Sequence, residues 1–368
     1  MTTVPDARAA DWSTTHPLDA VADRLAGARS VLIHTHGKPD GDAVGSTLAV
    51  ARALRARTPN PVDAAPVYAP PWPRRFDGVV GSTPVHHLRD PAANPPDESK
   101  PLAADLPEPD LHLVLDTGAW SQLEAVAPVL KPAAERTIIV DHHRHGDPDA
   151  ASMRHVDPSA AAVCALAAPI CVRVLGLDSS TDLPPEIATP LYLGLATDTG
   201  WFRFPNTTPA TLRLAADLQQ AGVNADELFQ LSEQSDTPAR LQLLRRALSS
   251  LELVEGDAVA VMSLSRNDFN RTGATMDESG GFVDIPKTVG TVQAVALITE
   301  VADGVVKVSM RSKAARDGAR DIDVNQVAQQ FGGGGHIHAA GARLTMPLDD
   351  ARALVTRALA DAARTAGA

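Results

Sequence analysis

Asp141, His142 and His143 follow the apolar run 137–140, and carboxylates and imidazoles are common metal ligands. Three other apolar runs end in residues of the same types: His36, Asp40 and Asp42 after residues 31–33, Asp116 after residues 113–115, and Asp198 after residues 193–197. A two-metal hydrolytic centre needs such groups close together, because paired divalent ions activate water and hold a phosphoryl group for in-line attack. The chain therefore has the residue types for metal-assisted hydrolysis of a phosphate ester.

Each of these carboxylates also has a structural explanation. Asp40 or Asp42 could cap the helix predicted at 43–57, and this cluster alone does not separate capping from ligation. Gly41, between the two aspartates, allows the loop to bend sharply. Asp116 and Asp198 are each followed by threonine and glycine, as turn residues often are. The metal interpretation therefore depends on the set as a whole.

The histidines divide in the same way. Two adjacent histidines after a buried strand are rarely both structural, and His142 is the better ligand candidate of its pair. His34 is more typical of a strand side chain, and His86, His87 and His145 are more typical of solvated loops. Nitrogen and carboxylate ligands without a thiolate favour Mn²⁺, Fe²⁺ or Zn²⁺ over Ca²⁺. The candidate ligands are His36, Asp40, Asp42, Asp116, His142 and Asp198.

Strand-like and helical patterns alternate from about residue 29 to about residue 200. Strands are predicted at 31–33, 62–68, 111–115 and 137–140, and helices at 43–57, 122–130, 160–175 and 186–196. This alternation is typical of an α/β domain with a mostly parallel sheet flanked by helices. Such sheets bind ligands outside the carboxyl ends of their strands, where the clusters at 36–42, 116 and 141–143 are expected to lie.

Length and composition indicate a soluble protein of two domains. A chain of 368 residues with 44% apolar residues is long for one compact core. Its two cysteines, Cys164 and Cys171, stand seven apart in an apolar stretch, which excludes a disulfide framework and favours a reducing compartment. We find no apolar signal segment and no membrane-length apolar run, so we expect a cytoplasmic protein. The net charge of −12 argues against binding of long duplexes, although bound divalent ions allow a small phosphate ligand.

The rest of the chain contains a proline-rich stretch and a second domain. Prolines are dense between residues 59 and 110, and residues 92–109 are predicted to be an exposed loop. Strands are predicted at 258–264, 292–301, 305–310 and 342–346, and helices at 324–331 and 348–362. We expect a catalytic domain at 1–232, a helical linker at 233–252 and a smaller α/β domain at 253–368.

Several residues outside the metal set could bind a phosphate or a base. Residues 332–335 are four glycines and are predicted to form a loop before His336, whose amides can approach a phosphate closely. Arg311 follows a predicted strand and could pair with a phosphate, although a lone arginine there is usually solvated. Arg203 stands among aromatic residues that could stack on a base or pack in the core.

The motifs, in their order along the chain, resemble the DHH phosphoesterase family, and most closely its branch of nanoRNases and 3′-phosphoadenosine-5′-phosphate (pAp) phosphatases with a DHH-associated C-terminal domain. The resemblance extends from about residue 20 to about residue 360. It is carried by His36-x-x-Pro39-Asp40-Gly41-Asp42, Asp116, Asp141-His142-His143, Thr197-Asp198-Thr199-Gly200, Arg311-Ser312, and Gly332-Gly333-Gly334-Gly335-His336.

The resemblance implies two Mn²⁺ ions per chain. One would be held by His36, Asp40 and Asp116, and the other by Asp42, Asp116, His142 and Asp198, so that Asp116 bridges them. Asp141 would orient an imidazole, and His143 would contact the scissile phosphate. The substrate-binding residues would be Arg203, Arg311, Ser312, Gly333, Gly334, Gly335 and His336.

The expected activity is that of a Mn-dependent phosphodiesterase and exoribonuclease that degrades very short oligonucleotides (nanoRNA) to mononucleotides and dephosphorylates pAp. Expected partners are short single-stranded RNA or DNA, pAp and cyclic dinucleotides, and the expected assembly is a monomer or homodimer. One alternative is a phosphodiesterase for cyclic di-AMP or its linear product pApA. The other is an inactive nucleotide-binding sensor, against which the complete ligand set argues.

Overall fold

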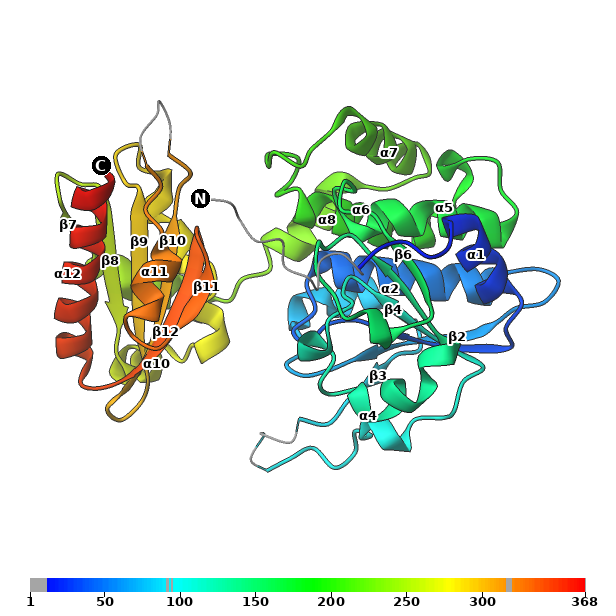
Figure 1. Cartoon of the computed structure of the whole chain (residues 1–368), viewed down its shortest axis with the longest axis horizontal. Helices are drawn as coiled ribbons and strands as arrows, with labels where there is room; N and C mark the ends of the chain where they lie inside the picture. Colours follow the sequence, from blue (N-terminus) through cyan, green and yellow to red (C-terminus); the bar gives the residue numbers. More distant parts are fainter. Residues whose placement is uncertain (1–11, 91–92, 94, 316–319, 368) are drawn as a thin grey trace. The chain divides into compact units, whose positions relative to one another are not determined.

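A computed structural model describes residues 12–90, 93, 95–315 and 320–367. Residues 1–11, in which no apolar signal segment is expected, and residues 91, 92 and 94 of the proline-rich stretch lie outside the described residues. The chain divides into two compact units, Met1–Ser235 and Asp236–Ala368, which Figure 1 shows from blue to green and from green to red. Each unit is an α/β structure with a sheet of its own, as the sequence predicts.

The first unit is built on a six-stranded parallel sheet. Its strands are β1 (Ser30–His34), β2 (Asp63–Tyr68), β3 (His86–His87), β4 (Leu111–Leu115), β5 (Thr137–Asp141) and β6 (Met153–Val156). Their order across the sheet is β3-β2-β1-β4-β5-β6, with every pair parallel. The strand order therefore reverses between β1 and β4. Open α/β sheets bind ligands at such a switch point, outside the carboxyl ends of the strands.

Helices cover both faces of this sheet, so its strands are apolar on both sides. Helices α2 (Gly41–Ala56), α5 (Val163–Leu175) and α6 (Pro185–Asp198) pack on one face with Val31 and Ile33, whereas Leu32 faces the opposite side with α4 (Ala127–Leu130). Figure 1 shows α5 and α6 on one side of the sheet and α4 on the other. Helices α1 (Leu18–Ala26), α3 (Asp77–Val80), α7 (Pro209–Gln220) and α8 (Ala225–Glu233) complete the unit.

Two helix predictions in this unit are only partly correct. Of the helix predicted at 122–130, only Ala127–Leu130 is α-helical, and Trp120–Gln122 is a 3₁₀ turn. Pro128 lacks the N–H that would continue a helix from Glu124, so the helix starts beside it instead. The helix predicted at 160–175 begins at Val163, because a carboxylate of α2 accepts its first N–H groups.

One of two predicted loops in this unit differs in the structure. His86 and His87, expected in a solvated loop, form the short edge strand β3. The His87 ring is half-buried against Tyr68 and Trp72, and these aromatic contacts explain why the segment is a strand and not a solvated loop. The described part of 92–109 is a loop with one 3₁₀ turn at Ala103–Asp105, as expected.

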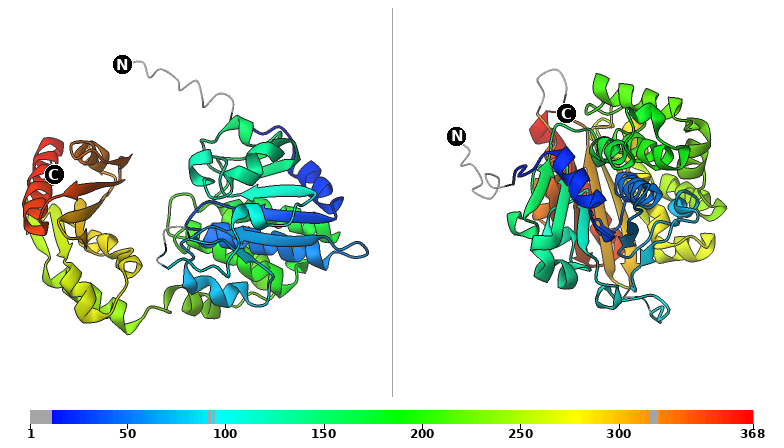
Figure 2. Two further views of the ribbon diagram at one scale, coloured as in Figure 1. Left: turned by 90° about the horizontal axis from the view of Figure 1, so that it is seen from below. Right: turned by 90° about the vertical axis from the view of Figure 1, so that its right-hand side faces the viewer.

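The second unit has a mixed sheet. Its strands are β7 (Glu252–Val254), β8 (Val259–Leu264), β9 (Ala294–Ala302), β10 (Val305–Ser312), β11 (Gly334–His336) and β12 (Ala339–Thr345), in the order β11-β12-β10-β9-β8-β7. Only β8 and β9 pair in parallel among these described strands. Helices α11 (Val324–Gln329) and α12 (Leu348–Ala366) cover one face, and α9 (Pro238–Ser249) and α10 (Arg266–Thr272) cover the other (Figure 2).

The glycine run is not the loop that the sequence predicts. Gly334, Gly335 and His336 form strand β11, and its partner β12 begins at Ala339, three residues before the strand predicted at 342–346. A Cβ on Gly333 would lie 2.2 Å from the carbonyl oxygen of Gly341. Glycine is therefore required because two backbones approach closely, and not to make a flexible loop.

Candidate metal centre

The loop between β1 and α2 supplies three of the candidate ligands. Oδ1 of Asp40 accepts hydrogen bonds from the N–H groups of Asp42 and Ala43, at 3.0 and 3.1 Å, so Asp40 caps α2. Oδ1 of Asp40 also lies 3.9 Å from Nε2 of His36. Asp40 therefore caps α2 and also lies within the cluster of ligand candidates. Gly41 is needed for close packing rather than for a bend, because a Cβ there would lie 2.3 Å from Oγ1 of Thr197.

Asp42 connects α2 to α5. Its Oδ1 accepts the N–H of Cys164 at 2.9 Å, and its Oδ2 accepts the N–H of Val163 at 2.5 Å. The side chain is fully buried, and burial together with the carboxylates of Asp116 and Asp198 raises the pKa of Asp42 well above its usual value. A carboxylate held beside two others in this way needs a cation to compensate its charge.

Asp116 follows β4 and lies at the centre of the cluster. Its backbone is left-handed, with φ of 68°, which is a strained conformation for a residue with a side chain. Oδ2 of Asp116 is 3.4 Å from Nε2 of His36, and Oδ1 is 3.3 Å from Nε2 of His142. Oδ1 is buried and has no hydrogen-bond partner among the described residues. Asp116 therefore faces His36 with one carboxylate oxygen and His142 with the other.

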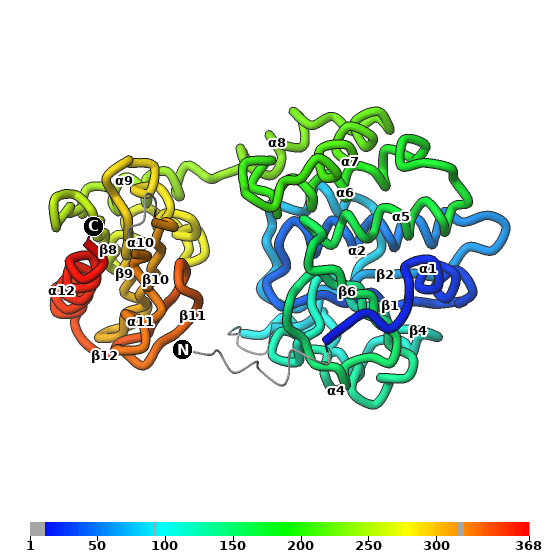
Figure 3. Tube along the Cα trace, turned by 45° about the horizontal axis from the view of Figure 1, so that its top comes forward, coloured from blue at the N-terminus to red at the C-terminus, as the bar shows by residue number. Residues whose placement is uncertain are grey.

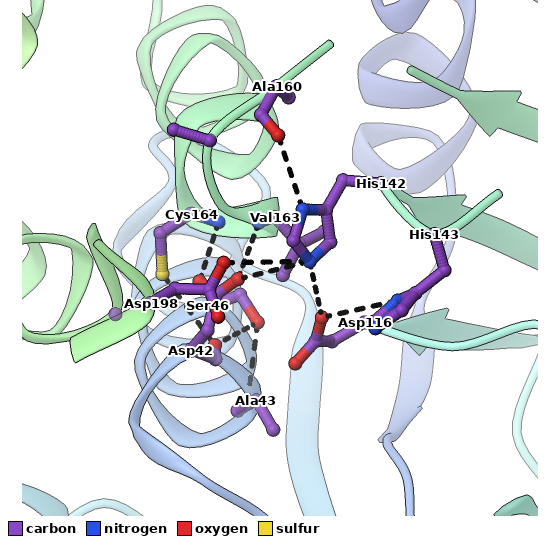
Figure 4. A network of polar contacts seen from close by, with 12 residues as sticks. Asp42, Ala43, Ser46, Asp116, His142, His143, Ala160, Val163, Cys164 and Asp198 are labelled. Atoms are coloured by element: carbon purple, nitrogen blue, oxygen red, sulfur yellow. Dashed lines mark hydrogen bonds and ion pairs between the residues drawn. The ribbon is translucent and has the colours of Figure 1, made fainter. Parts of the chain in front are cut away.

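The two histidines after β5 are held differently. Nδ1 of His142 faces the carbonyl oxygen of Ala160 at 3.2 Å, so it carries a hydrogen, and Nε2 points into the cluster, where it can bind a metal once its own proton is lost. Oδ1 of Asp141 accepts hydrogen bonds from the N–H groups of His142 and His143, and lies 2.8 Å from Nδ1 of His143. Asp141 therefore orients His143 rather than His142. Figure 4 shows His142 and His143 on either side of Asp116.

Asp198 is the last residue of α6 and reaches the cluster from a helix, not from a strand. Its Oδ2 lies 3.9 Å from Nε2 of His142, the same distance as Oδ2 of Asp42. Burial and the neighbouring carboxylates raise the pKa of Asp198 to about 6. The prediction of a helix before Asp198 is confirmed, and the helix brings a sixth ligand candidate to the carboxyl end of the sheet.

The carboxylates of the cluster raise the pKa of both ligand histidines. Burial lowers the pKa of His36, but the carboxylate of Asp116 raises it more, to about 9. The pKa of His142 is likewise lowered by burial and raised more by Asp116 and Asp42, to about 10. Both imidazoles are therefore cations at neutral pH when no metal is bound, and a divalent ion would replace their protons.

Two groups of ligand atoms fit metal ions. His36, Asp40 and Asp116 form one group, and Asp42, His142 and Asp198 form another, with the ligand atoms of each group within 4.8 Å of one another. Asp116 also groups with His142 and His143. Cys164 is not a competing ligand, because burial raises its pKa well above its usual value and keeps it a thiol. The nitrogen and carboxylate donors, with the unpartnered Oδ1 of Asp116, fit hard or borderline divalent ions.

The cluster opens into a cavity of about 340 Å³. Arg144 and the exposed His145 line it beside His36, Asp116 and His142. The sequence analysis did not select Arg144, although its place next to His143 was a usable signal. The buried His34 stays outside the cluster, as expected, because its Nε2 lies 2.9 Å from Nδ1 of His112.

A second cavity of about 250 Å³ touches Asp40 and Asp198. Arg203 lines it, together with Arg75, which the sequence analysis missed. Nε of Arg203 donates a hydrogen bond to the carbonyl oxygen of Gly200 at 2.6 Å. Two of the neighbouring aromatic residues pack in the unit, since Trp201 contacts Phe229 and Phe202 contacts Tyr192, whereas Phe204 is exposed.

In the second unit, the predicted substrate residues Arg311 and His336 lie on β10 and β11, which flank β12. Arg311 pairs with Ala339, and Ala339 pairs with His336, so Arg311 and His336 occupy one row across β10, β12 and β11. Residues in such a row share a face of the sheet. Ser312 is buried, and its Oγ lies 2.9 Å from Nδ1 of His338, a residue that the sequence analysis did not select.

Comparison with known proteins agrees with this arrangement. The model of the DHH family N-terminal domain matches residues 30–195, and the model of the DHHA1 domain matches residues 256–362. A protein of Thermus thermophilus named bifunctional oligoribonuclease and PAP phosphatase NrnA is 33% identical over 92% of this chain and 91% of its own length. The chain belongs to the DHH family.

One further relative and one solved structure are similar to this DHH phosphoesterase. A protein of the same name from Bacillus subtilis is 26% identical over 86% of the chain and 89% of that protein. An exopolyphosphatase-related protein from Bacteroides fragilis shares the fold, with a TM-score of 0.80 and 22% identity over 95% of this chain and 97% of that one. Among the described residues, no helix is long and apolar enough to cross a membrane.

Proposed function

We propose that this DHH-family chain is a two-metal phosphoesterase that degrades very short oligonucleotides to mononucleotides and also dephosphorylates pAp. The observation that carries the proposal is the meeting of two ligand groups at Asp116, one with His36 and Asp40 and the other with His142 and its carboxylates. The substrate class is taken from the names of the Thermus thermophilus and Bacillus subtilis relatives.

Two Mn²⁺ ions would complete the centre. His36, Asp40 and Asp116 would hold one, and Asp42, Asp116, His142 and Asp198 the other. Bound ions of this kind supply an activated water and neutralise charge that develops on a phosphoryl group. Asp141 keeps the His143 imidazole in one orientation and raises its pKa, so that the protonated ring can donate a hydrogen bond from Nε2 to a phosphate oxygen.

Substrate binding would involve residues of both units. In the first unit, Arg203 and Arg75 line a cavity next to Asp40 and Asp198, where a guanidinium can pair with a phosphate. In the second unit, Arg311 and His336 share a face of the sheet, and Gly333, Gly334 and Gly335 directly precede His336. These groups would hold the part of the nucleotide that does not react.

One assay tests this function. The purified protein with Mn²⁺ is incubated with labelled RNAs of two to 24 nucleotides, pAp, pApA and cyclic di-AMP, and the products are separated. We expect mononucleotides from the shortest RNAs and AMP from pAp, with much slower cleavage of the longest RNAs. The Asp116→Ala variant, prepared in the same way, controls for contaminating nucleases. Preferred cleavage of cyclic di-AMP, or binding without turnover, would contradict the proposal.

A further inference from the structure

The segment before α1 is anchored to the edge strand β6. The backbone N–H of Thr15 donates to the carbonyl oxygen of Arg154 at 2.8 Å, and the hydroxyl of Thr14 donates to that of Val156 at 2.7 Å. The N–H groups of Arg154 and Val156 donate in return to the two threonine hydroxyls. Figure 3 shows this blue segment running beside β6. These bonds fix the position of Trp12, two residues before Thr14.

The Trp12 side chain packs against the two loops that follow β4 and β5. It is 6% exposed and lies in the core cluster on the α4 side of the sheet. A Cβ on Gly118 would lie 1.8 Å from the indole ring, and one on Gly146 would lie 2.5 Å from it. Gly118 is two residues after Asp116, and Gly146 is three residues after His143. Both loops therefore need glycine where the indole touches them.

Trp12 also forms a hydrogen bond with the main chain of the metal centre. Its Nε1–H donates to the carbonyl oxygen of His143 at 3.2 Å. The two loops are joined to each other beside it, because the N–H of Asp147 donates to the carbonyl oxygen of Gly118 and the N–H of Trp120 donates to Oδ2 of Asp147. The indole thus packs where the loop after Asp116 is hydrogen-bonded to the loop after His143.

We propose that Trp12 is a positioning residue for phosphate-ester hydrolysis, acting through His143. Asp141 holds the imidazole of His143 from one side, and Trp12 holds its carbonyl group from the other. Because the carbonyl and the imidazole of His143 are both held, the ring keeps its direction toward the site of the reacting phosphate. A catalytic group held in the reactive geometry increases the rate. The inference rests on the proposed function, because it concerns the same reaction.

The first test measures the loops without using activity. Trp12→Phe keeps an aromatic ring against the glycines and removes the N–H donor. In metal-free protein, hydrogen–deuterium exchange should become about three- to tenfold faster in residues 143–147, because a neutral hydrogen bond is lost. Trp72→Phe is the matched control, because it also removes an indole N–H. In the wild-type protein this N–H donates to Oδ1 of Asp77 at 2.6 Å. Unchanged exchange in 143–147 in Trp12→Phe would overturn the proposal.

The second test is a double-mutant cycle on bis-p-nitrophenyl phosphate. Trp12→Phe should lower kcat about three- to tenfold, with KM within about twofold and metal content unchanged by elemental analysis. In the His143→Ala background it should lower kcat less than about 1.5-fold, because its effect passes through His143. Gly146→Ala, whose Cβ would displace the indole, should show the same dependence on His143.

An equal fall of kcat in both backgrounds would overturn the proposal and assign Trp12 to general stability. An unchanged kcat in Trp12→Phe would overturn it as well. Neither result is confused with failure of the proposed function, which the wild-type substrate panel tests by itself.

Discussion

Asp141 and His143 are joined twice: Oδ1 of Asp141 lies 2.8 Å from Nδ1 of the imidazole and accepts the backbone N–H of the same residue at 3.1 Å. The partners of His142 are different. Its Nδ1 faces a backbone carbonyl, and its Nε2 faces three carboxylates. Adjacent histidines thus have different partners, and we expect them to have different roles.

The first prediction separates these roles. His143→Ala should keep close to two bound Mn²⁺ per chain and lose about a hundredfold or more in rate, because a positioned acid or hydrogen-bond donor is removed. Metal content is measured by elemental analysis after removal of free ions. His155→Ala is a control, because His155 is a histidine of β6 that contacts only the carbonyl oxygen of His16 among the polar groups described. A metal-depleted His143→Ala protein would show that the two histidines have been assigned wrongly.

The second prediction concerns Asp116. Its two oxygens face two histidines from different ligand groups, so Asp116→Ala removes one ligand from each proposed ion. We expect turnover below roughly a tenth of the wild-type rate and reduced metal content, with folding retained by circular dichroism. Asp116→Asn keeps the shape and one neutral oxygen, and should bind metal better than the alanine variant. A rate above roughly a tenth in Asp116→Ala would exclude a bridging role.

The third prediction is a pH dependence of metal binding. The metal-free pKa values of about 9 for His36 and about 10 for His142 lie above neutral pH, so both rings are protonated there and must lose protons to bind an ion. Binding of Mn²⁺ at pH 7.5 should release about two protons per chain. The apparent affinity should rise as the pH rises toward 9, because fewer protons then compete.

Calorimetry in two buffers with different protonation enthalpies measures this release. Below about pH 6, Asp198 also becomes protonated, and a third proton should be released. His36→Gln should release about one proton fewer at pH 7.5. Metal binding with no proton release at that pH would show that the two imidazoles are neutral in the metal-free protein.

The fourth prediction concerns the second unit. Arg311→Ala and His336→Ala should reduce cleavage of dinucleotides and pAp about ten- to a hundredfold, as expected for loss of a charge-assisted contact of roughly 1.5–3 kcal/mol. Bis-p-nitrophenyl phosphate, which needs only the metal centre, should be hydrolysed at nearly the wild-type rate. Arg343→Ala, an exposed arginine on β12, is the control. Equal losses on both kinds of substrate, with folding intact, would remove the nucleotide-binding role from these residues.

The sequence by itself determined the ligand types and their places at the ends of elements. Hydrophobic runs of strand and helix length alternate, and this pattern is sufficient to predict a parallel sheet whose carboxyl ends carry His36, Asp116 and His142. The adjacency of these residues follows from the strand order, because β1 lies beside β4 and β4 beside β5. The hydrophobic runs and the ligand types at their ends can be predicted from sequence because each depends only on residues close together in the chain.

Only the tertiary structure decided how those groups are held. Asp42 caps α5 from 121 residues away, and Trp12 reaches His143 from 131 residues away. Gly334 and Gly335 of the glycine run join a strand because the backbone of β12 lies against them, and not because of any signal within the run. Such contacts join segments that are distant in the chain. Their geometry depends on how whole elements pack, and no window of sequence contains that information.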